Sequence, residues 1–208
     1  MNKIITLLMI FSATLSAQDE TARNILNKLS ETHKLYNNIT VNFDLNYENK
    51  NLNIKEKQSG ILVISGDKFL LDIDDQIIIN NGEIQWIYLA DMNEVQIINH
   101  EEENNIMNPK NFFNFYERIS KYRYIGVKSE DKTRLHIIEL FPEESSMFMK
   151  VELTVNSEKN QLKNIILFDK SGGTYTYLIT SFISNSKETP QFIFNTEDYP
   201  DIDVIDLR

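Results

Sequence analysis

The stretch Ile77–Ile98, IIINNGEIQWIYLADMNEVQII, decides the fold that we predict for this chain. Asn81-Gly82 is its strongest hairpin signal, because a two-residue type I′ turn needs two residues that accept a positive φ. A second turn is expected at Ala90–Asn93. The β-rich runs that these turns separate are Ile77-Ile78-Ile79, Ile84 to Leu89, and Val95-Gln96-Ile97-Ile98. The stretch therefore predicts an antiparallel three-stranded meander with Trp86, the only tryptophan, on its middle strand.

Most of the chain on either side of this meander alternates with the period of a β-strand. From Ile39 to Tyr47, apolar residues stand at every second position between polar ones, which is typical of a strand with one wet face. Further strands are predicted at 53–64, 68–73, 122–127, 134–141, 147–156, 162–168, 174–183 and 192–194. About 11 strands joined by short turns favour a mainly β protein whose antiparallel sheet is curled into a barrel or half-barrel.

Two or three helices are expected to accompany this sheet, and two of them can be placed in the sequence. Asp19–Asn37 places its apolar residues on one stripe, at the spacing of an amphipathic helix. Asn108-Pro109 opens a shorter second helix, NPKNFFNFYERIS, in which proline occupies the first turn and aromatic residues lie on more than one face. A helix of that composition must be covered or must itself cover an apolar surface.

The N-terminus predicts a secretory signal peptide over residues 1–17. Lys3 supplies the positive region, Ile4 to Phe11 the apolar region, and Ser12 to Ala17 the small-residue cleavage zone. The apolar run is too short for a transmembrane helix, which needs about 20 such residues. The 208-residue chain is 41% hydrophobic, and we expect residues 18–208 to form a single domain.

Composition excludes several classes of function. The chain has no cysteine, which removes disulfides, zinc–thiolate sites, thiol catalysis and a lipid-bearing cysteine after the cleavage site. The formal net charge is −10, and an acidic surface repels phosphate backbones, so nucleic acid is not an expected partner.

No motif for catalysis or metal binding emerges from the polar residues. His33, His100 and His136 are scattered and lack the spacing of a helical zinc site. The acidic segment His100–Asn105 has neither the alternate spacing nor the glycine of a calcium loop. Ser171-Gly172-Gly173 is typical of a hairpin turn and not of a nucleophile elbow. We therefore expect no enzyme, no metal and no cofactor.

The apolar residues of the sheet and the two helices leave two alternatives open for the concave face. The two helices could simply plug the concave face of the sheet, or they could cover a cavity that takes acyl chains. Periodicity is the same in both cases and does not separate them.

The whole mature chain resembles the LolA-type periplasmic carriers of outer-membrane lipoproteins. The parts that match, in order, are the amphipathic helix ending in LYNNITVNFDLNY, Gly60 opening GILVISGDKFLLDI, Gly82-x-x-x-Trp86-x-Tyr88, Asn108-Pro109 with its aromatic helix, and the ending FIFNTEDYPDIDVIDLR. No single part is diagnostic, but their order behind a signal peptide and without cysteine is fairly specific.

This resemblance implies an incomplete antiparallel barrel with helices over its concave apolar face. It implies a monomeric periplasmic carrier that takes acylated lipoproteins from an inner-membrane ABC transporter and delivers them to an outer-membrane acceptor. The absence of cysteine argues against the lipid-anchored acceptor itself. The alternative is an envelope sensor on the same fold, which would bind lipid or protein without moving it.

The sequence departs from the family at the lid. Its best-studied members have an arginine after the glycine-initiated strand that tethers the lid, and here that place reads Ser65-Gly66-Asp67-Lys68. Lys68 lacks the planar fork of arginine and is not equivalent. The residues that the resemblance and the pattern together predict as cavity lining are Leu26, Leu29, Phe43, Leu62, Phe69, Leu71, Trp86, Phe112, Phe113 and Tyr116.

Overall fold

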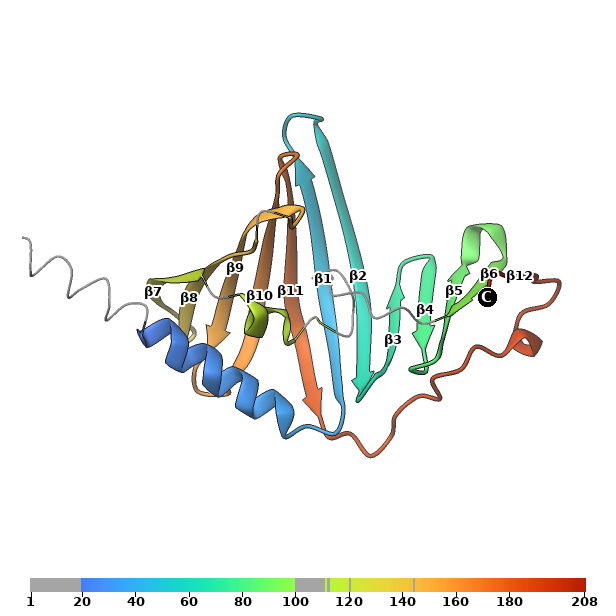
Figure 1. The fold of residues 1–208 in the computed structure, drawn as a ribbon, viewed down its shortest axis with the longest axis horizontal. Helices are drawn as coiled ribbons and strands as arrows, with labels where there is room; N and C mark the ends of the chain where they lie inside the picture. Colours follow the sequence, from blue (N-terminus) through green and yellow to red (C-terminus); the bar gives the residue numbers. More distant parts are fainter. Residues whose placement is uncertain (1–19, 100–110, 112, 120, 144) are drawn as a thin grey trace, which may run out of the picture.

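One curved, open β-sheet organises the molecule (Figure 1). The structure is a computed structural model that describes residues 20–99, 111, 113–119, 121–143 and 145–208. Helix occupies residues 20–34 of the described part. The strands are β1 (Ile39–Asn49), β2 (Ile54–Ser65), β3 (Lys68–Ile73), β4 (Gln76–Asn80), β5 (Ile84–Leu89), β6 (Glu94–Asn99), β7 (Lys121–Glu130), β8 (Thr133–Phe141), β9 (Phe148–Asn156), β10 (Gln161–Asp169), β11 (Gly173–Ser184) and β12 (Asp203–Asp206).

The 12 strands run in the order β12-β6-β5-β4-β3-β2-β1-β11-β10-β9-β8-β7, and the sheet does not close on itself. All neighbours are antiparallel except β12, which pairs parallel with β6. The prediction of an incomplete antiparallel barrel is therefore confirmed. The alternation of apolar and polar residues predicted these strands correctly because each long strand presents one apolar face. β1 does so with Val41, Phe43 and Leu45.

The concave face carries the main core. Val41 of β1 faces Leu62 of β2, and Leu62 faces Leu71 of β3, so these side chains share one side of the sheet. The helix at residues 20–34 crosses this side over β7–β11 (Figure 1), and its Ala22, Leu26 and Leu29 are buried in the same cluster as the strands. The helix is held there by burial of its apolar stripe.

Three local predictions differ from the structure. The turn after β4 spans Asn81-Gly82-Glu83 and is not a type I′ turn: among its described residues only Gly82 has a positive φ. The Asn81 side chain accepts the backbone N–H groups of Glu83 and Ile84, which closes the turn instead. In the described part of that segment, the expected aromatic helix is replaced by 3₁₀ structure, at Asn111 and in η3 (Phe115–Arg118).

The third difference is at 192–194, where the described chain forms no strand, and the tail forms β12 instead. Phe194 is buried against Tyr88 and Tyr199 on the face of the sheet opposite the helix, so packing against the meander overrides its strand propensity. The predicted signal peptide lies outside the described residues.

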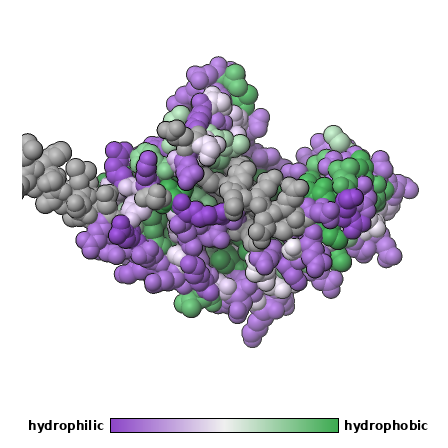
Figure 2. Space-filling model, in the orientation of Figure 1, coloured by the Kyte–Doolittle hydropathy of each residue, from purple (hydrophilic) through white to green (hydrophobic). Residues whose placement is uncertain are grey.

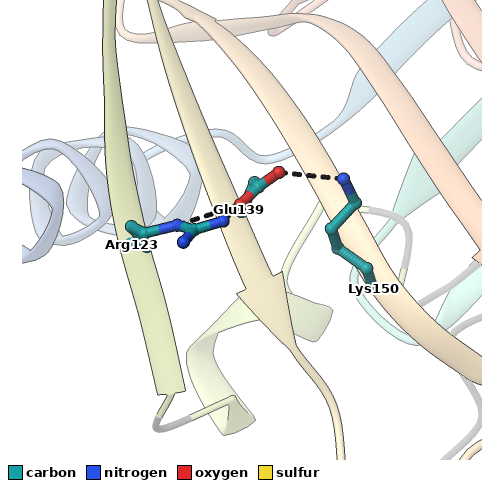
Figure 3. A network of polar contacts seen from close by, with 3 residues as sticks. All are labelled: Arg123, Glu139 and Lys150. Atoms are coloured by element: carbon teal, nitrogen blue, oxygen red, sulfur yellow. Dashed lines mark hydrogen bonds and ion pairs between the residues drawn. The ribbon is translucent and has the colours of Figure 1, made fainter.

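An ionic network stabilises the outer face of β7–β9 (Figure 3). Glu139 of β8 lies between Arg123 of β7 and Lys150 of β9, whose Nζ is 2.8 Å from the Glu139 Oε1 atom. Burial raises the pKa of the Glu139 carboxyl, but hydrogen bonds from Lys150 and Arg123 outweigh burial and lower it below its ordinary value. The carboxylate is thus kept charged, and it joins three strands where a sheet edge begins.

Candidate functional site

A cavity of about 490 Å³ lies on the concave face, over the strands that the helix leaves uncovered. This volume is within the range of small-molecule binding pockets. Its apolar floor and walls come from strands β1–β5 and β11. The lining residues are Phe43, Leu45, Gln58, Leu62, Leu71, Ile73, Asp74, Asp75, Gln76, Leu89, Asp91, Met92 and Tyr177. Figure 2 shows hydrophobic surface gathered over the β4–β6 and β12 end of the same side.

The charges of the cavity are confined to its mouth. Asp74 and Asp75 lie in the turn between β3 and β4, and Asp91 lies in the 3₁₀ turn η1 (Ala90–Met92) between β5 and β6. Among the described residues that line the cavity, none is a lysine, arginine, histidine or serine. Burial raises the pKa of Tyr177 to about 12, so its hydroxyl stays neutral. The described lining can shelter apolar chains, and it offers no nucleophile–base pair.

Of the predicted lining residues, Phe43, Leu62 and Leu71 line this cavity. Leu26 and Leu29 of the helix lie outside the lining, as do Phe69, Phe113 and Tyr116, but all five belong to the apolar cluster that contains Phe43 and Leu62. Phe112 lies outside the described residues. The apolar and aromatic lining residues that were not predicted are Leu45, Ile73, Leu89, Met92 and Tyr177. The alternation of Leu45 with Phe43 on one strand face was a usable signal for that residue.

Trp86 does not lie on the cavity side of the sheet with the other predicted lining residues. Register places Trp86 opposite Ile79 of β4, whereas Leu71 lies opposite Ile78, so Trp86 points to the other face of the sheet. There it is 9% exposed in a second cluster with Ile79, Tyr88, Val95 and Phe194. The expectation that Trp86 shares the cavity with Leu71 therefore fails, because every second residue of β5 faces the opposite way.

Gly60 of β2 makes room for the Phe43 ring at the cavity wall. It lies directly opposite Phe43, and a Cβ atom there would come within 2.7 Å of the Phe43 Cζ atom and 2.9 Å of the Asp72 carbonyl oxygen. The phenyl ring can move, but the Asp72 backbone is fixed in the sheet. Glycine is thus required here by close approach and not by backbone conformation.

We predict that Gly60→Ala lowers the free energy of unfolding by about 1–3 kcal/mol, the usual cost of overpacking. It should also push Phe43 toward the cavity and weaken binding of any apolar ligand there. Urea unfolding measures the first effect and ligand titration the second. Gly66→Asn is a matched control, since Gly66 has φ +58 with nothing within 4 Å and asparagine tolerates that backbone. A Gly60→Ala midpoint equal to that of the wild type would contradict the clash.

The C-terminal end of the helix is fastened to neighbouring segments by polar contacts. His33 Nδ1 lies 3.2 Å from the Phe113 carbonyl oxygen, and the Ser30 hydroxyl donates to the Glu117 carboxylate. The Ser65 hydroxyl, on the last residue of β2, lies 3.4 Å from the Asn37 carbonyl oxygen. The end of β2 therefore reaches the segment after the helix through a serine.

His33 should make stability dependent on pH. Burial lowers the pKa of His33 although the Phe113 carbonyl and Glu117 act in the opposite direction. Below the unfolded-state pKa of about 6.5, the unfolded chain binds more protons than the folded one, so the free energy of unfolding falls as pH drops below that value.

The measurement is urea unfolding at pH 7.5 and 5.5. We expect His33→Gln to reduce the loss of stability on acidification. The pKa of His136 is also lowered by burial, but its imidazole is less buried than that of His33, so His136→Gln should reduce the loss by a smaller amount. An unchanged pH dependence in His33→Gln would refute the assignment.

In the part of the chain that the structure covers, no three carboxylate or imidazole groups are arranged to hold a metal ion. Within the same residues, no helix has the length and apolarity needed to cross a bilayer.

Comparison with known proteins gives one match at the level of sequence families. The family described as "Outer membrane lipoprotein carrier protein LolA" matches residues 12–167. No curated protein matches the chain.

Solved structures give similarity of fold. An uncharacterized conserved protein from Thermus thermophilus has a TM-score of 0.59 at 10% identity, over 89% of this chain and 99% of its own. A LolA superfamily protein from Nitrosomonas europaea has a TM-score of 0.47 at 15% identity, over 85% and 98%. The lipoprotein LppX from Mycobacterium tuberculosis has a TM-score of 0.48 at 11% identity, over 82% and 99%.

Proposed function

Because the chain belongs to the LolA family of outer-membrane lipoprotein carriers, we propose that it carries acylated lipoproteins across the periplasm. In this proposal residues 18–208 are the mature, monomeric chain, exported by the signal peptide at 1–17. Cargo comes from an inner-membrane ABC transporter and passes to an outer-membrane acceptor. The observation that carries the proposal is the apolar cavity on the concave face, whose described lining holds no cationic residue.

The energetics of acyl chains explain why a carrier needs such a cavity. Each methylene that leaves water gains about 0.8 kcal/mol, so the chains of a lipoprotein do not cross an aqueous compartment uncovered. Leu62, Leu71 and Leu89 provide apolar contact for methylene groups, and the neutral Tyr177 hydroxyl adds no charge. The described lining has no basic group to match an oxyanion or a phosphate.

The test is native mass spectrometry of the mature protein purified from its own periplasm, followed by lipid extraction. Bound lipoprotein or acyl species support the carrier. Deletion of the gene then separates transport from sensing: loss of a carrier strands lipoproteins at the inner membrane, whereas loss of a sensor changes signalling only. A protein that carries no lipid and accepts no lipoprotein from membranes would refute the proposal.

A further inference from the structure

The C-terminal tail packs on the face of the sheet opposite the cavity. After β11 the chain runs beneath the meander and ends in β12, which adds parallel to the free edge of β6 (Figure 1). The Leu207 N–H donates to the Ile97 carbonyl oxygen at 2.8 Å, just beyond the paired residues. The tail is thus docked by backbone pairing along one edge.

Aromatic packing fixes the middle of the tail. The Phe194 and Tyr199 rings stack with centroids 4.7 Å apart, and Tyr88 of β5 contacts Tyr199 at 4.5 Å and Phe194 at 5.4 Å. Trp86 belongs to the same buried cluster. Its indole therefore lies under the tail and can report whether the tail is docked.

Asn93 joins the docked tail to the sheet. Its side-chain Nδ2 donates to the Pro200 carbonyl oxygen at 3.1 Å, and its own carbonyl oxygen accepts the Asp203 N–H at 3.0 Å. The Tyr88 hydroxyl lies 3.5 Å from its Oδ1 atom. Asn93 also adopts φ 48, a left-handed conformation that asparagine tolerates better than most residues.

The residues just before Asn93 form part of the cavity mouth. The Asn93 N–H donates to the Ala90 carbonyl oxygen and closes η1, which carries the lining residues Asp91 and Met92. The Ala90 N–H in turn donates at 2.8 Å to the carbonyl oxygen of Asp75, in the other turn of the mouth. A short hydrogen-bonded path thus connects Pro200, on the tail, to both turns of the mouth.

We propose that the docked C-terminal tail holds the mouth of the cavity in its ligand-binding shape, and that Asn93 is the positioning residue that couples the two. This inference rests on the proposed function. Filling the cavity stabilises the docked tail, and loosening the tail speeds departure of the ligand. At equilibrium, the ligand and the docked tail stabilise each other by the same coupling free energy, because such a coupling acts equally in both directions.

The test uses the full mature chain and a synthetic triacylated cysteinyl peptide as ligand. Asn93→Asp keeps the size of the side chain and its tolerance for a left-handed backbone but removes the amide that donates to Pro200. Asn93→Gly removes the same amide and keeps the backbone conformation, so a folding defect peculiar to one variant does not decide the result. Asn160→Asp is the matched control, since Asn160 also has φ 48 but lies in the β9–β10 turn.

We expect both Asn93 variants to release the peptide to excess liposomes about fivefold faster than the wild type, as the loss of one hydrogen bond would give. Asn160→Asp should release it at the wild-type rate. In the wild type, saturating peptide should shift Trp86 emission and slow exchange of the Asp203 and Leu207 amides. Trp86 faces away from the cavity, and the two amides lie at the edge of the sheet, in β12 and just after it. These signals should weaken in the Asn93 variants.

Two failures are distinguishable. Binding of the peptide with unchanged release rates, silent Trp86 emission and unchanged tail exchange would overturn the coupling and leave the carrier proposal intact. A wild-type chain that binds no peptide would overturn the carrier proposal and this inference together.

Discussion

Leu71→Glu is expected to lower the affinity for a triacylated lipopeptide by about 100-fold or more. Leu71 lines the cavity between Leu62 and Ile78 on the concave face, and it is only half-buried. In the unliganded protein the new carboxylate can keep its hydration. An acyl chain would have to displace that water and leave the charge without a partner, because the described lining contains no lysine or arginine. Ligand titration and urea unfolding together separate binding from stability.

Ile61→Glu is the matched control, because it introduces the same charge into the adjacent strand β2 but on the opposite face of the sheet. Ile61 precedes Leu62 on β2, is 43% exposed, and pairs with Asp72 instead of Leu71. The same substitution there places its charge in water on the other side of the sheet, so binding should stay within about twofold of the wild type. Equal loss of binding in both variants would mean that added negative charge, and not the cavity, determines affinity.

Period-two alternation predicted most strands because their two faces differ in polarity. β1 is the clearest case, with Val41, Phe43 and Leu45 buried between polar neighbours. The same rule could not orient β5, whose sequence IQWIYL carries apolar residues on both faces. Ile87 and Leu89 lie on the cavity side while Trp86 and Tyr88 lie under the tail, a difference that only the pairing register determines.

Long-range packing explains the remaining differences. The segment at 192–194 has strand-forming residues, yet it becomes a buried connection because the aromatic cluster around Tyr88 accepts Phe194. The pairing of β12 with β6 joins residues about a hundred positions apart and leaves no local signal. The position of the cavity beside the helix, and not beneath it, likewise depends on where the helix docks.

Leu29→Ala is expected to lower the free energy of unfolding by about 2–5 kcal/mol. Leu29 is fully buried, on the helix stripe that packs in one cluster with strands β1–β3 and β8–β11. Truncation removes three carbons from a site bounded by rigid strands, which can refill the space only in part. Urea unfolding, followed by far-ultraviolet circular dichroism, gives the loss. Leu35→Ala provides the reference, because Leu35 is 78% exposed just beyond the same helix and its loss should cost less than about 0.5 kcal/mol.

Comparing Leu29→Ala with Leu35→Ala also shows whether the helix unfolds together with the sheet or detaches from it alone. If the helix is a fixed part of the core, Leu29→Ala shifts the unfolding midpoint of the whole sheet, and exchange of helix and sheet amides rises together. If the helix detaches alone as a lid, the helix amides of Leu29→Ala exchange faster, while its urea-unfolding midpoint stays equal to that of Leu35→Ala. The burial of Leu29 in one cluster with residues of seven strands favours the first result. The concave cavity, to which the helix contributes no lining residue in the described structure, would then open and close through its mouth at the turns and not through movement of the helix.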